Sequence, residues 1–160
     1  MEIRIRGLDP VQDGKNVDRI VRSSGFFAPE EAELAARYFR EASDGGADCE
    51  HRFLFAEAAG KTSGFANFGP AGFGGVSWYL HWIAVDDSLR GKGIGRALLR
   101  ASEDAILSAG GVKVFIETSS TELYRPTHGF YTGCGYRLEA TLTDYYRIGD
   151  HQLIFSRYLA

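Results

Sequence analysis

The stretch Val76–Thr118 constrains the fold more than any other part of the sequence. It begins with VSWYLHWIAV and ends with VKVFIET, and both runs are rich in the aromatic and β-branched residues typical of strands. Between them, a glycine-rich turn leads directly into a segment of helical periodicity with the apolar face Ile94, Ala97, Leu98, Ala101 and Ala105. Two strands joined through one helix form a parallel pair with a right-handed crossover. The stretch therefore predicts an α/β fold, with Glu103 on the outer, charged face of the helix.

The turn Arg90–Gly95 has the properties of an anion site. Its glycines carry no Cβ, so a ligand could lie directly against the backbone. The first N–H groups of a helix have no partner within the helix, and the helix dipole adds partial positive charge there. A pyrophosphate can accept these donors, and Arg90, Lys92 and Arg96 add full charges. The residues alone also fit a tight strand-to-helix turn without a ligand.

Two familiar phosphate-binding patterns do not fit this turn. A dinucleotide fingerprint needs Gly-x-Gly-x-x-Gly, whereas Gly91, Gly93 and Gly95 occupy every second position. A Walker A loop needs Lys-Ser/Thr after its last glycine, and Arg96 stands there instead. The turn does fit the pattern Arg/Gln-x-x-Gly-x-Gly/Ala at every position.

That pattern resembles the acetyl-CoA pyrophosphate loop of the GNAT superfamily of N-acetyltransferases. Trp82–Val85 is similar to the strand that precedes this loop in the superfamily, and Phe130-Tyr131-x-x-x-Gly135-Tyr136 is similar to a later superfamily motif. The resemblance implies the GNAT fold, a mixed, mostly antiparallel sheet of six or seven strands flanked by helices. It also implies that the parallel strand pair splays apart at the cofactor site.

The resemblance also implies which residues contact acetyl-CoA. The pantetheine arm is expected to pair with the backbone of the first parallel strand, and the turn is expected to hold the pyrophosphate. Tyr124 is a further expected contact, close to the motif tyrosine. The expected cofactor-binding residues are Ile83, Ala84, Val85, Arg90, Gly91, Lys92, Gly93, Ile94, Gly95, Arg96 and Tyr124.

Acetyl transfer to an amine needs a proton acceptor for the amine and a proton donor for the departing thiolate. A thiol has a pKa of about 8.5, so a weak acid such as tyrosine suffices as donor. Tyr131 occupies the superfamily position whose hydroxyl often faces the CoA sulfur; the alternative role is packing beside Phe130.

Two side chains are candidates for the proton acceptor. Glu117 resembles the glutamate proposed as general base in bacterial ribosomal-protein N-terminal acetyltransferases, and it ends a parallel strand, where α/β sites form. His81 is a candidate because histidine ordinarily titrates near neutral pH. It lies within a strand, however, where a structural role is common. Water is the third route for the proton.

The acceptor substrate is less clearly specified. Tyr145-Tyr146 resembles a tyrosine pair that lines the peptide site of N-terminal acetyltransferases, although strand packing also explains such residues. Those enzymes carry an asparagine where this chain has Tyr124, which puts a protein N-terminal substrate in doubt.

Composition excludes several classes of protein. A length of 160 residues suits one domain, so we expect residues 1–160 to form a single N-acetyltransferase domain. The net charge of −3 gives no basic field for nucleic acid. Cys49 and Cys134 lack metal-ligand spacing, so we expect no metal and a cytoplasmic protein with reduced thiols. We expect no signal peptide and no membrane span. The sequence does not specify the oligomeric state, for which a homodimer is one alternative.

Turn signals and periodicity divide the rest of the chain into short elements. Asp9-Pro10 predicts a helix start, because aspartate favours the N-cap and proline the first helical position. Both faces of the central strand carry large side chains, so we expect both to be covered. The other expected elements are a strand around Ile3 and Ile5, a helix from Pro29, a hairpin at 53–58 and 64–68, a connector at 69–75, a short helix near Pro126, and a closing pair at 136–140 and 145–159.

Together these features predict an enzyme that transfers an acetyl group from acetyl-CoA to a primary amine of a small molecule or peptide, by direct attack in a ternary complex. The main alternative is a non-catalytic acyl-CoA-binding module of the same fold, because the motifs specify CoA binding more firmly than turnover. A nicotinamide oxidoreductase is a distant third.

Overall fold

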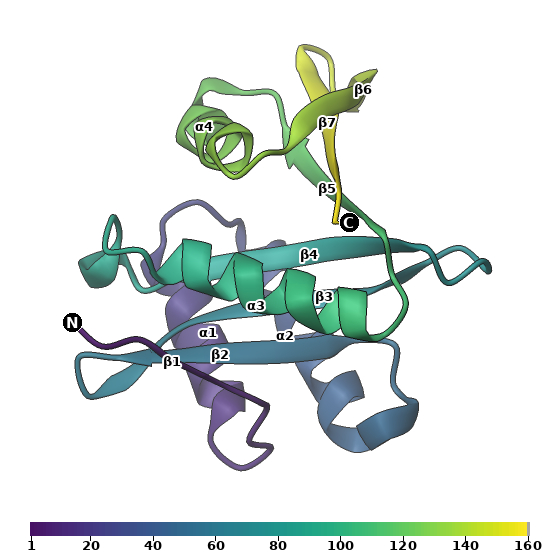
Figure 1. Ribbon diagram of the computed structural model, residues 1–160. Coiled ribbons are helices and arrows are strands. Elements are labelled where there is room, and N and C mark those ends of the chain that lie inside the picture. The colour runs from purple at the N-terminus through teal and green to yellow at the C-terminus, as the bar shows by residue number, and fades with distance from the viewer. Residues whose placement is uncertain (160) are drawn as a thin grey trace. The chain divides into compact units, whose positions relative to one another are not determined.

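The structure is a computed structural model that describes residues 1–159, with the side chain at position 47 left out. Seven strands form a mixed, mostly antiparallel sheet in the order β1-β2-β3-β4-β5-β7-β6 (Figure 1). The strands are β1 (Arg4–Arg6), β2 (Arg52–Ala58), β3 (Lys61–Ala71), β4 (Ser77–Val85), β5 (Lys113–Ser119), β6 (Arg137–Arg147) and β7 (Asp150–Tyr158). The α-helices are α1 (Asp13–Ser23), α2 (Pro29–Gly45), α3 (Ile94–Ser108) and α4 (Arg125–Gly133), and short 3-10 helices are η1 (Gly46–Asp48), η2 (Asp87–Leu89) and η3 (Glu122–Tyr124).

The chain forms two compact units. The first contains Met1–Gly69 and Leu80–Ala105, and the second contains Pro70–Tyr79 and Ile106–Ala160. Because β4 passes from the second unit into the first, the two units share one continuous strand.

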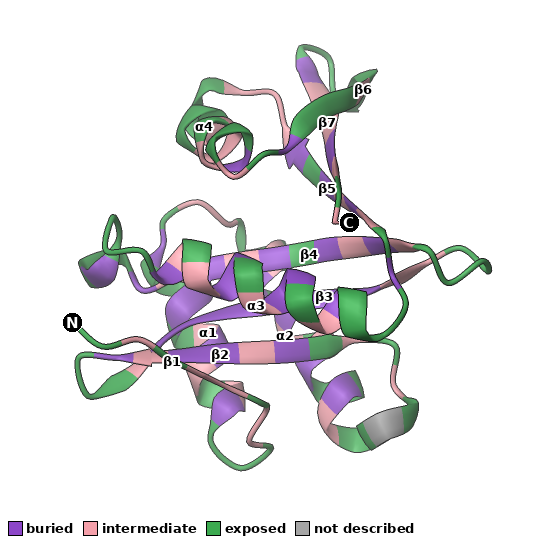
Figure 2. Cartoon of the chain, viewed as in Figure 1, coloured by how far each residue is buried: buried purple, intermediate pink, exposed green. Residues whose placement is uncertain are grey.

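An aromatic and aliphatic core holds the first unit together. Helix α1 buries Val17, Ile20 and Val21, which recur at the spacing of one helical face. These side chains belong to the same buried cluster as Phe39 of α2 and Phe53 of β2, whose rings meet edge to face at 5.8 Å. Figure 2 shows buried residues, in purple, along β2 and β3 and within α1 and α2.

An ion pair fixes the start of α1. Asp13 is 0% exposed and accepts two hydrogen bonds from the Arg6 guanidinium, at 2.7 and 2.8 Å. The expected helix start at Asp9-Pro10 is wrong: the Asp9 carboxylate accepts the N–H groups of Val11 and Gln12 in a preceding turn, and the helix begins at Asp13. The ion pair with Arg6 of β1 sets this boundary, and the N-cap and proline signals used to predict helix starts do not include such a pair.

The second unit is built around the predicted parallel pair. Residues Ser77–Tyr79 of β4 pair in parallel with Lys113–Phe115 of β5, which confirms the crossover through α3. Strand β5 pairs antiparallel with β7, and β7 with β6, so β6 is the outermost strand at this end of the sheet. The buried side chains in this unit include Val114, Ile116, Tyr131, Tyr136 and Phe155.

Several boundaries differ from those expected. Strand β3 continues through Gly69 and Pro70, so the connector is shorter than 69–75. The expected division of the closing pair into 136–140 and 145–159 is wrong: Tyr145 and Tyr146 lie on β6, and the hairpin turns at 148–149, where Gly149 has φ of 85°. The register shifts twice along β6, which explains why a regular two-residue period did not reveal the strand.

Two burial expectations also need correction. One face of β4 is buried as expected, but the opposite face is half-buried and His81 on it is exposed. Glu103, expected on the outer face of α3, is only 9% exposed. The short helix near Pro126, the helix from Pro29 and the Ala59-Gly60 turn, at φ 52° and 76°, are confirmed.

Both Cys49 and Cys134 are free thiols. No helix in the described part of the chain is long and apolar enough to cross a membrane.

We predict that Asp13→Asn lowers the free energy of unfolding by roughly 3 kcal/mol at pH 7, the low end for breaking a buried ion pair, because the Arg6 guanidinium loses its buried carboxylate and keeps only Glu57, at 2.7 Å. Burial alone would raise the pKa of Asp13, but hydrogen bonds from Arg6, the Asp9 N–H and Asn16 outweigh it and hold the pKa below its usual value. Such a group stabilises the fold above its ordinary pKa of about 3.9 and loses this contribution as the pH falls through the folded-state value.

Urea unfolding at several pH values measures this effect, and the difference between wild type and variant should shrink in acid. The matched control is Asp18→Asn on the same helix, whose carboxylate pairs with Arg22 while both side chains are about half exposed, at 49% and 56%. This control should cost less than about 1 kcal/mol. Equal losses from the two variants would show that the buried pair does not anchor α1.

Candidate active site

The glycine-rich turn joins η2 to α3 and holds an open backbone surface. Gly91 and Gly93 adopt φ of 73° and 86°, a left-handed conformation that side chains with a Cβ disfavour. A Cβ at either position would meet nothing within 4 Å. The glycines are therefore required by backbone conformation, and the space beside them is open to a ligand.

The first turn of α3 presents N–H groups that have no acceptor within the helix. The N–H of Ala97 donates to the Gly93 carbonyl at 3.0 Å, so the N–H groups of Ile94, Gly95 and Arg96 precede the first hydrogen bond of the helix. Lys92 and Arg96 are exposed beside them. The side chain of Ile94 is only 1% exposed, which leaves its backbone as the part available to an anion. Donors and charges of this kind suit a pyrophosphate.

Arg90 has a structural role in the first unit. Its Nη2 donates to the Ser24 carbonyl at 2.7 Å, and its guanidinium carbon lies 4.1 Å from the centre of the Phe26 ring. Its Nε also lies 3.5 Å from an Asp87 carboxylate oxygen. These contacts tie the turn to the end of α1, so Lys92 and Arg96 are better placed than Arg90 to meet a ligand.

The segment between β4 and the turn is fixed by a carboxylate that the sequence analysis missed. Asp86 is 6% exposed and pairs with Arg19 at 2.6 Å and Lys61 at 2.9 Å. A hydrogen bond from Ser88, followed by that from Lys61, holds the pKa of Asp86 well below its usual range. The Asp-x-Ser spacing is a turn signal that could have found it. The expected cofactor contacts Ile83–Val85 are the last residues of β4 and directly precede Asp86. Ala84 is buried, and its two neighbours are half-buried.

The second unit brings together two predicted site residues and two that were not predicted. Glu117 is exposed on β5, and its Oε2 accepts a hydrogen bond from Gln152 Nε2 at 3.1 Å. The same Nε2 lies 3.3 Å from the hydroxyl oxygen of Tyr146. The Tyr79 hydroxyl also hydrogen-bonds Glu117; burial first, and then the charge of Glu117, raise the pKa of Tyr79.

Tyr145 extends this cluster to the surface. Its ring meets that of Tyr146 edge to face, with centroids 5.0 Å apart. The two residues remain 58% and 45% exposed, so packing within the sheet does not account for them. Exposed aromatic side chains beside a carboxylate provide a surface that a cationic ligand can contact.

Tyr131 lies on α4, deep in the second unit. Its ring packs against Phe130, Tyr136 and Phe155, at centroid distances of 5.3, 5.9 and 6.3 Å, and the residue is 7% exposed. Burial, and to a smaller extent Cys134, raise the pKa of Tyr131 well above its usual value. Within the described residues its hydroxyl makes no hydrogen bond, so the proton remains available.

Other elements carry two further predicted residues. Tyr124 immediately precedes α4 and is half-buried. His81 belongs to the first unit, where its ring lies 5.7 Å from those of Tyr38 and His51. Desolvation by surrounding groups, together with His51, lowers the pKa of His81 to about 4, although part of its side chain remains exposed.

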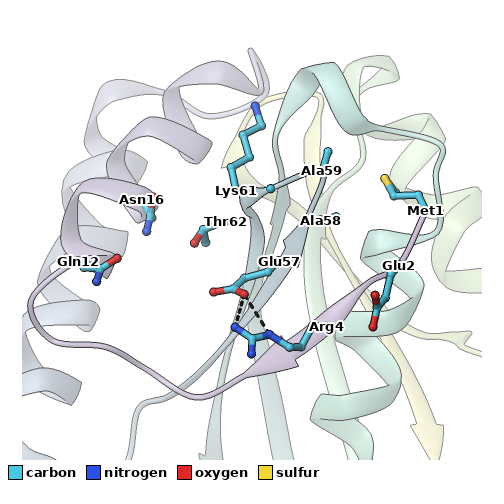
Figure 3. A pocket seen from close by; sticks show the side chains of 11 residues that line it. Met1, Glu2, Arg4, Gln12, Asn16, Glu57, Ala58, Ala59, Lys61 and Thr62 are labelled. Carbon is cyan, nitrogen blue, oxygen red and sulfur yellow. Dashed lines mark hydrogen bonds and ion pairs between the residues drawn. The ribbon is translucent and has the colours of Figure 1, made fainter.

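A recess at the β2–β3 hairpin contains none of the predicted site residues. Figure 3 shows that it is lined by the N-terminal segment and the hairpin, with the Arg4 guanidinium reaching Glu57; Arg4 Nε lies 3.0 Å from Glu57 Oε2. No cluster of metal ligands occurs among the residues that the structure describes.

The fold and sequence match known acetyltransferases. The profile of the acetyltransferase (GNAT) family matches residues 18–136. An acetyltransferase from Desulfovibrio desulfuricans that is assigned to the GNAT family shares 35% identity and a TM-score of 0.92, over 99% of this chain and 100% of that chain. No curated protein matches the sequence.

More distant structures share the fold. An aminoglycoside 6'-N-acetyltransferase complexed with coenzyme A has 20% identity and a TM-score of 0.78, over 98% of this chain and 97% of that chain. The ribosomal-protein-S18-alanine N-acetyltransferase from Escherichia coli has 20% identity and a TM-score of 0.77, over 99% of this chain and 95% of that chain.

We predict that Gly93→Ala weakens the binding of coenzyme A at least tenfold, because a Cβ disturbs the left-handed backbone on which the donors at the start of α3 depend. Isothermal titration calorimetry measures the affinity. Gly110→Ala is the matched control: Gly110 lies just after the same helix, has φ of 92°, and also has open space around its Cα. Both variants should lose about 1–2 kcal/mol of stability from backbone strain. If Gly110→Ala weakens binding as much as Gly93→Ala, the turn is not the anion site.

Proposed function

Because the chain belongs to the GNAT family of acetyltransferases, which use acetyl-CoA as acetyl donor, we propose that it acetylates a primary amine of a small molecule or peptide by direct attack in a ternary complex. Residues 1–160 act as one domain in this proposal. One observation carries it: Glu117 is an exposed carboxylate held by the neutral donors Tyr79 and Gln152, and it forms no ion pair with any described residue. An uncompensated carboxylate beside exposed aromatic rings suits an ammonium group.

The glycine-rich turn fits the anionic part of acetyl-CoA. The N–H groups of Ile94, Gly95 and Arg96 and the exposed cations Lys92 and Arg96 bind the pyrophosphate in this proposal. Acetyl-CoA itself supplies the activated thioester. The turn binds and orients this substrate, and contributes no group to the chemical step.

Glu117 accepts the proton that the amine must lose before it attacks. An alkylammonium group has a pKa near that of lysine, about 10.4, so at neutral pH it arrives protonated and needs an acceptor. Because Glu117 is exposed, it can pass this proton to water. His81, with a pKa of about 4, is neutral at pH 7 but is a weak acceptor.

Tyr131 donates a hydrogen bond to the departing sulfur. Its pKa lies above the ordinary tyrosine value, and therefore well above the thiol value of about 8.5, so complete transfer of its proton would be uphill. The buried phenol can still stabilise the thiolate as a donor, because the hydroxyl stays protonated throughout the neutral and mildly alkaline range.

A non-catalytic acyl-CoA-binding module is the competing proposal. An amine panel of amino acids, polyamines, aminoglycosides and N-terminal peptides, read by CoA release, decides between the two. Tight binding of acetyl-CoA with no release above the hydrolysis background for any amine would favour the module. The free thiols of Cys49 and Cys134 support a cytoplasmic location in either case.

We predict that Tyr131→Phe lowers kcat by roughly ten- to a thousand-fold with little change in acetyl-CoA affinity, because it keeps the buried ring but removes the donor. Comparison of acetyl-CoA with an acetyl thioester of a more acidic thiol measures the role directly. The loss should shrink with the better leaving group. Equal losses with both donors would assign Tyr131 to positioning, and no loss would assign it to packing.

We predict that Glu117→Gln lowers kcat about a hundredfold, in line with loss of a general base, while acetyl-CoA affinity stays constant. Steady-state kinetics and calorimetry provide both values. Glu122→Gln is the control: Glu122 lies on η3, and its side chain is 86% exposed. The assignment is wrong if His81→Asn shows the hundredfold loss and Glu117→Gln does not.

A further inference from the structure

Gln152 is the buried connection between Glu117 and Tyr146. It lies on β7, is 3% exposed, and stands opposite Ser119 of β5 in the antiparallel ladder. Its Nε2 is 3.1 Å from Glu117 Oε2 and 3.3 Å from the Tyr146 hydroxyl oxygen. Because Gln152 is fixed in the sheet, it can hold two more exposed side chains in a constant relation.

The chemistry of these groups determines the direction of each hydrogen bond. An ionised carboxylate only accepts, so one Nε2 hydrogen must point to Glu117. The second hydrogen points to Tyr146, whose oxygen therefore acts as acceptor in this contact. If the Gln152 amide were turned the other way, its carbonyl oxygen would face the Glu117 carboxylate. Both groups are acceptors, so no hydrogen bond could form between them. Tyr146 thus keeps its own O–H proton for another partner.

The same reasoning applies to Tyr79. Its hydroxyl hydrogen-bonds Glu117 and must be the donor. Glu117 therefore receives two neutral donors and retains lone pairs that face solvent. Among the described residues the Tyr146 O–H has no acceptor, and its ring is exposed. The cluster presents one acceptor, Glu117, and one donor, Tyr146, side by side at the surface.

We propose that Gln152 is a positioning residue that orients this acceptor–donor pair, and that the pair selects amines with an oxygen acceptor close to the nitrogen. This inference rests on the proposed function. The amine N–H groups are bound by Glu117, and a neighbouring carbonyl or hydroxyl oxygen accepts the Tyr146 proton. Amino alcohols and α-amino amides satisfy both contacts, whereas simple alkylamines leave Tyr146 unpaired.

Matched pairs of amines test the selectivity. With each kcat/KM calculated for the unprotonated amine, since the amines differ in pKa, wild type should favour ethanolamine over propylamine and glycinamide over butylamine by about tenfold, which corresponds to one hydrogen bond. Tyr146→Phe removes the donor at an exposed position and should abolish this ratio through a change in KM. Gln152→Met removes both hydrogen bonds at similar length, so it should abolish the ratio and also lower kcat.

The control is Gln12→Met, at the only other glutamine of the chain, which is exposed in the first unit and should leave the ratio unchanged. A wild-type ratio near one would overturn the selectivity. A ratio that persists in a folded Gln152→Met variant would overturn the role of Gln152. If Gln152→Met does not fold, the kcat/KM ratio of Tyr146→Phe still shows whether the Tyr146 hydroxyl contributes to the selectivity.

A second readout does not depend on turnover. Burial first, and then the charges of Glu117, Tyr145 and Asp150, raise the pKa of Tyr146, while the hydrogen bond from Gln152 lowers it. NMR titration of ring-labelled tyrosines should therefore show the Tyr146 phenol titrating at a higher pH in Gln152→Met than in wild type. An unchanged titration would overturn the assigned direction of the hydrogen bond. If no amine is acetylated by wild type while this shift appears, the proposed function fails and the hydrogen-bond assignment stands.

Discussion

Parallel pairing of β4 with β5 is the constraint on which the rest of the structure depends. Two parallel neighbours cannot be joined by a tight hairpin, so the chain must return through a crossover helix. That requirement places the start of α3 shortly after the end of β4, and its first N–H groups have no acceptor within the helix. It also makes left-handed backbone necessary at Gly91 and Gly93, where the chain changes direction. The features that suit a pyrophosphate are thus consequences of how the sheet is connected.

The carboxylates of the protein fall into two groups with different physical settings. Asp13 and Asp86 are buried and have cationic partners, so their charge is used to join elements of the first unit. Glu117 is exposed, and its partners Tyr79 and Gln152 are neutral. Neutral donors fix the direction of a carboxylate without neutralising it. This contrast in partners, more than position in the sheet, distinguishes a carboxylate that can serve a substrate from one that maintains the fold.

Local chemistry was enough to predict the elements whose signals lie close together in the chain. The turn before α3, the helix from Pro29 and the hairpin at Ala59-Gly60 all follow from glycine or proline at defined positions. The motif residues Glu117 and Tyr146 were also found, and the structure places them in one hydrogen-bonded cluster.

Features set by distant partners could not be predicted from the sequence. Gln152 sits in a strand as an ordinary polar residue, and only the register of β7 against β5 reveals its contacts. The start of α1 depends on Arg6, which lies on a strand seven residues away from Asp13. The end of β6 was missed because its shifts in register break the two-residue period.

The register shifts along β6 also affect whether a second chain can add a strand to this edge of the sheet. An outermost strand offers unpaired backbone groups to any other sheet it meets. Leu138 and Leu142 add exposed apolar surface along it, at 52% and 41%, and Ile148 in the following turn is 89% exposed. Register shifts and the left-handed Asp144, at φ of 56°, interrupt the flat edge that a second chain would need for strand addition. The irregular part of β6 that carries the tyrosine pair therefore also disfavours the addition of a second chain at this edge.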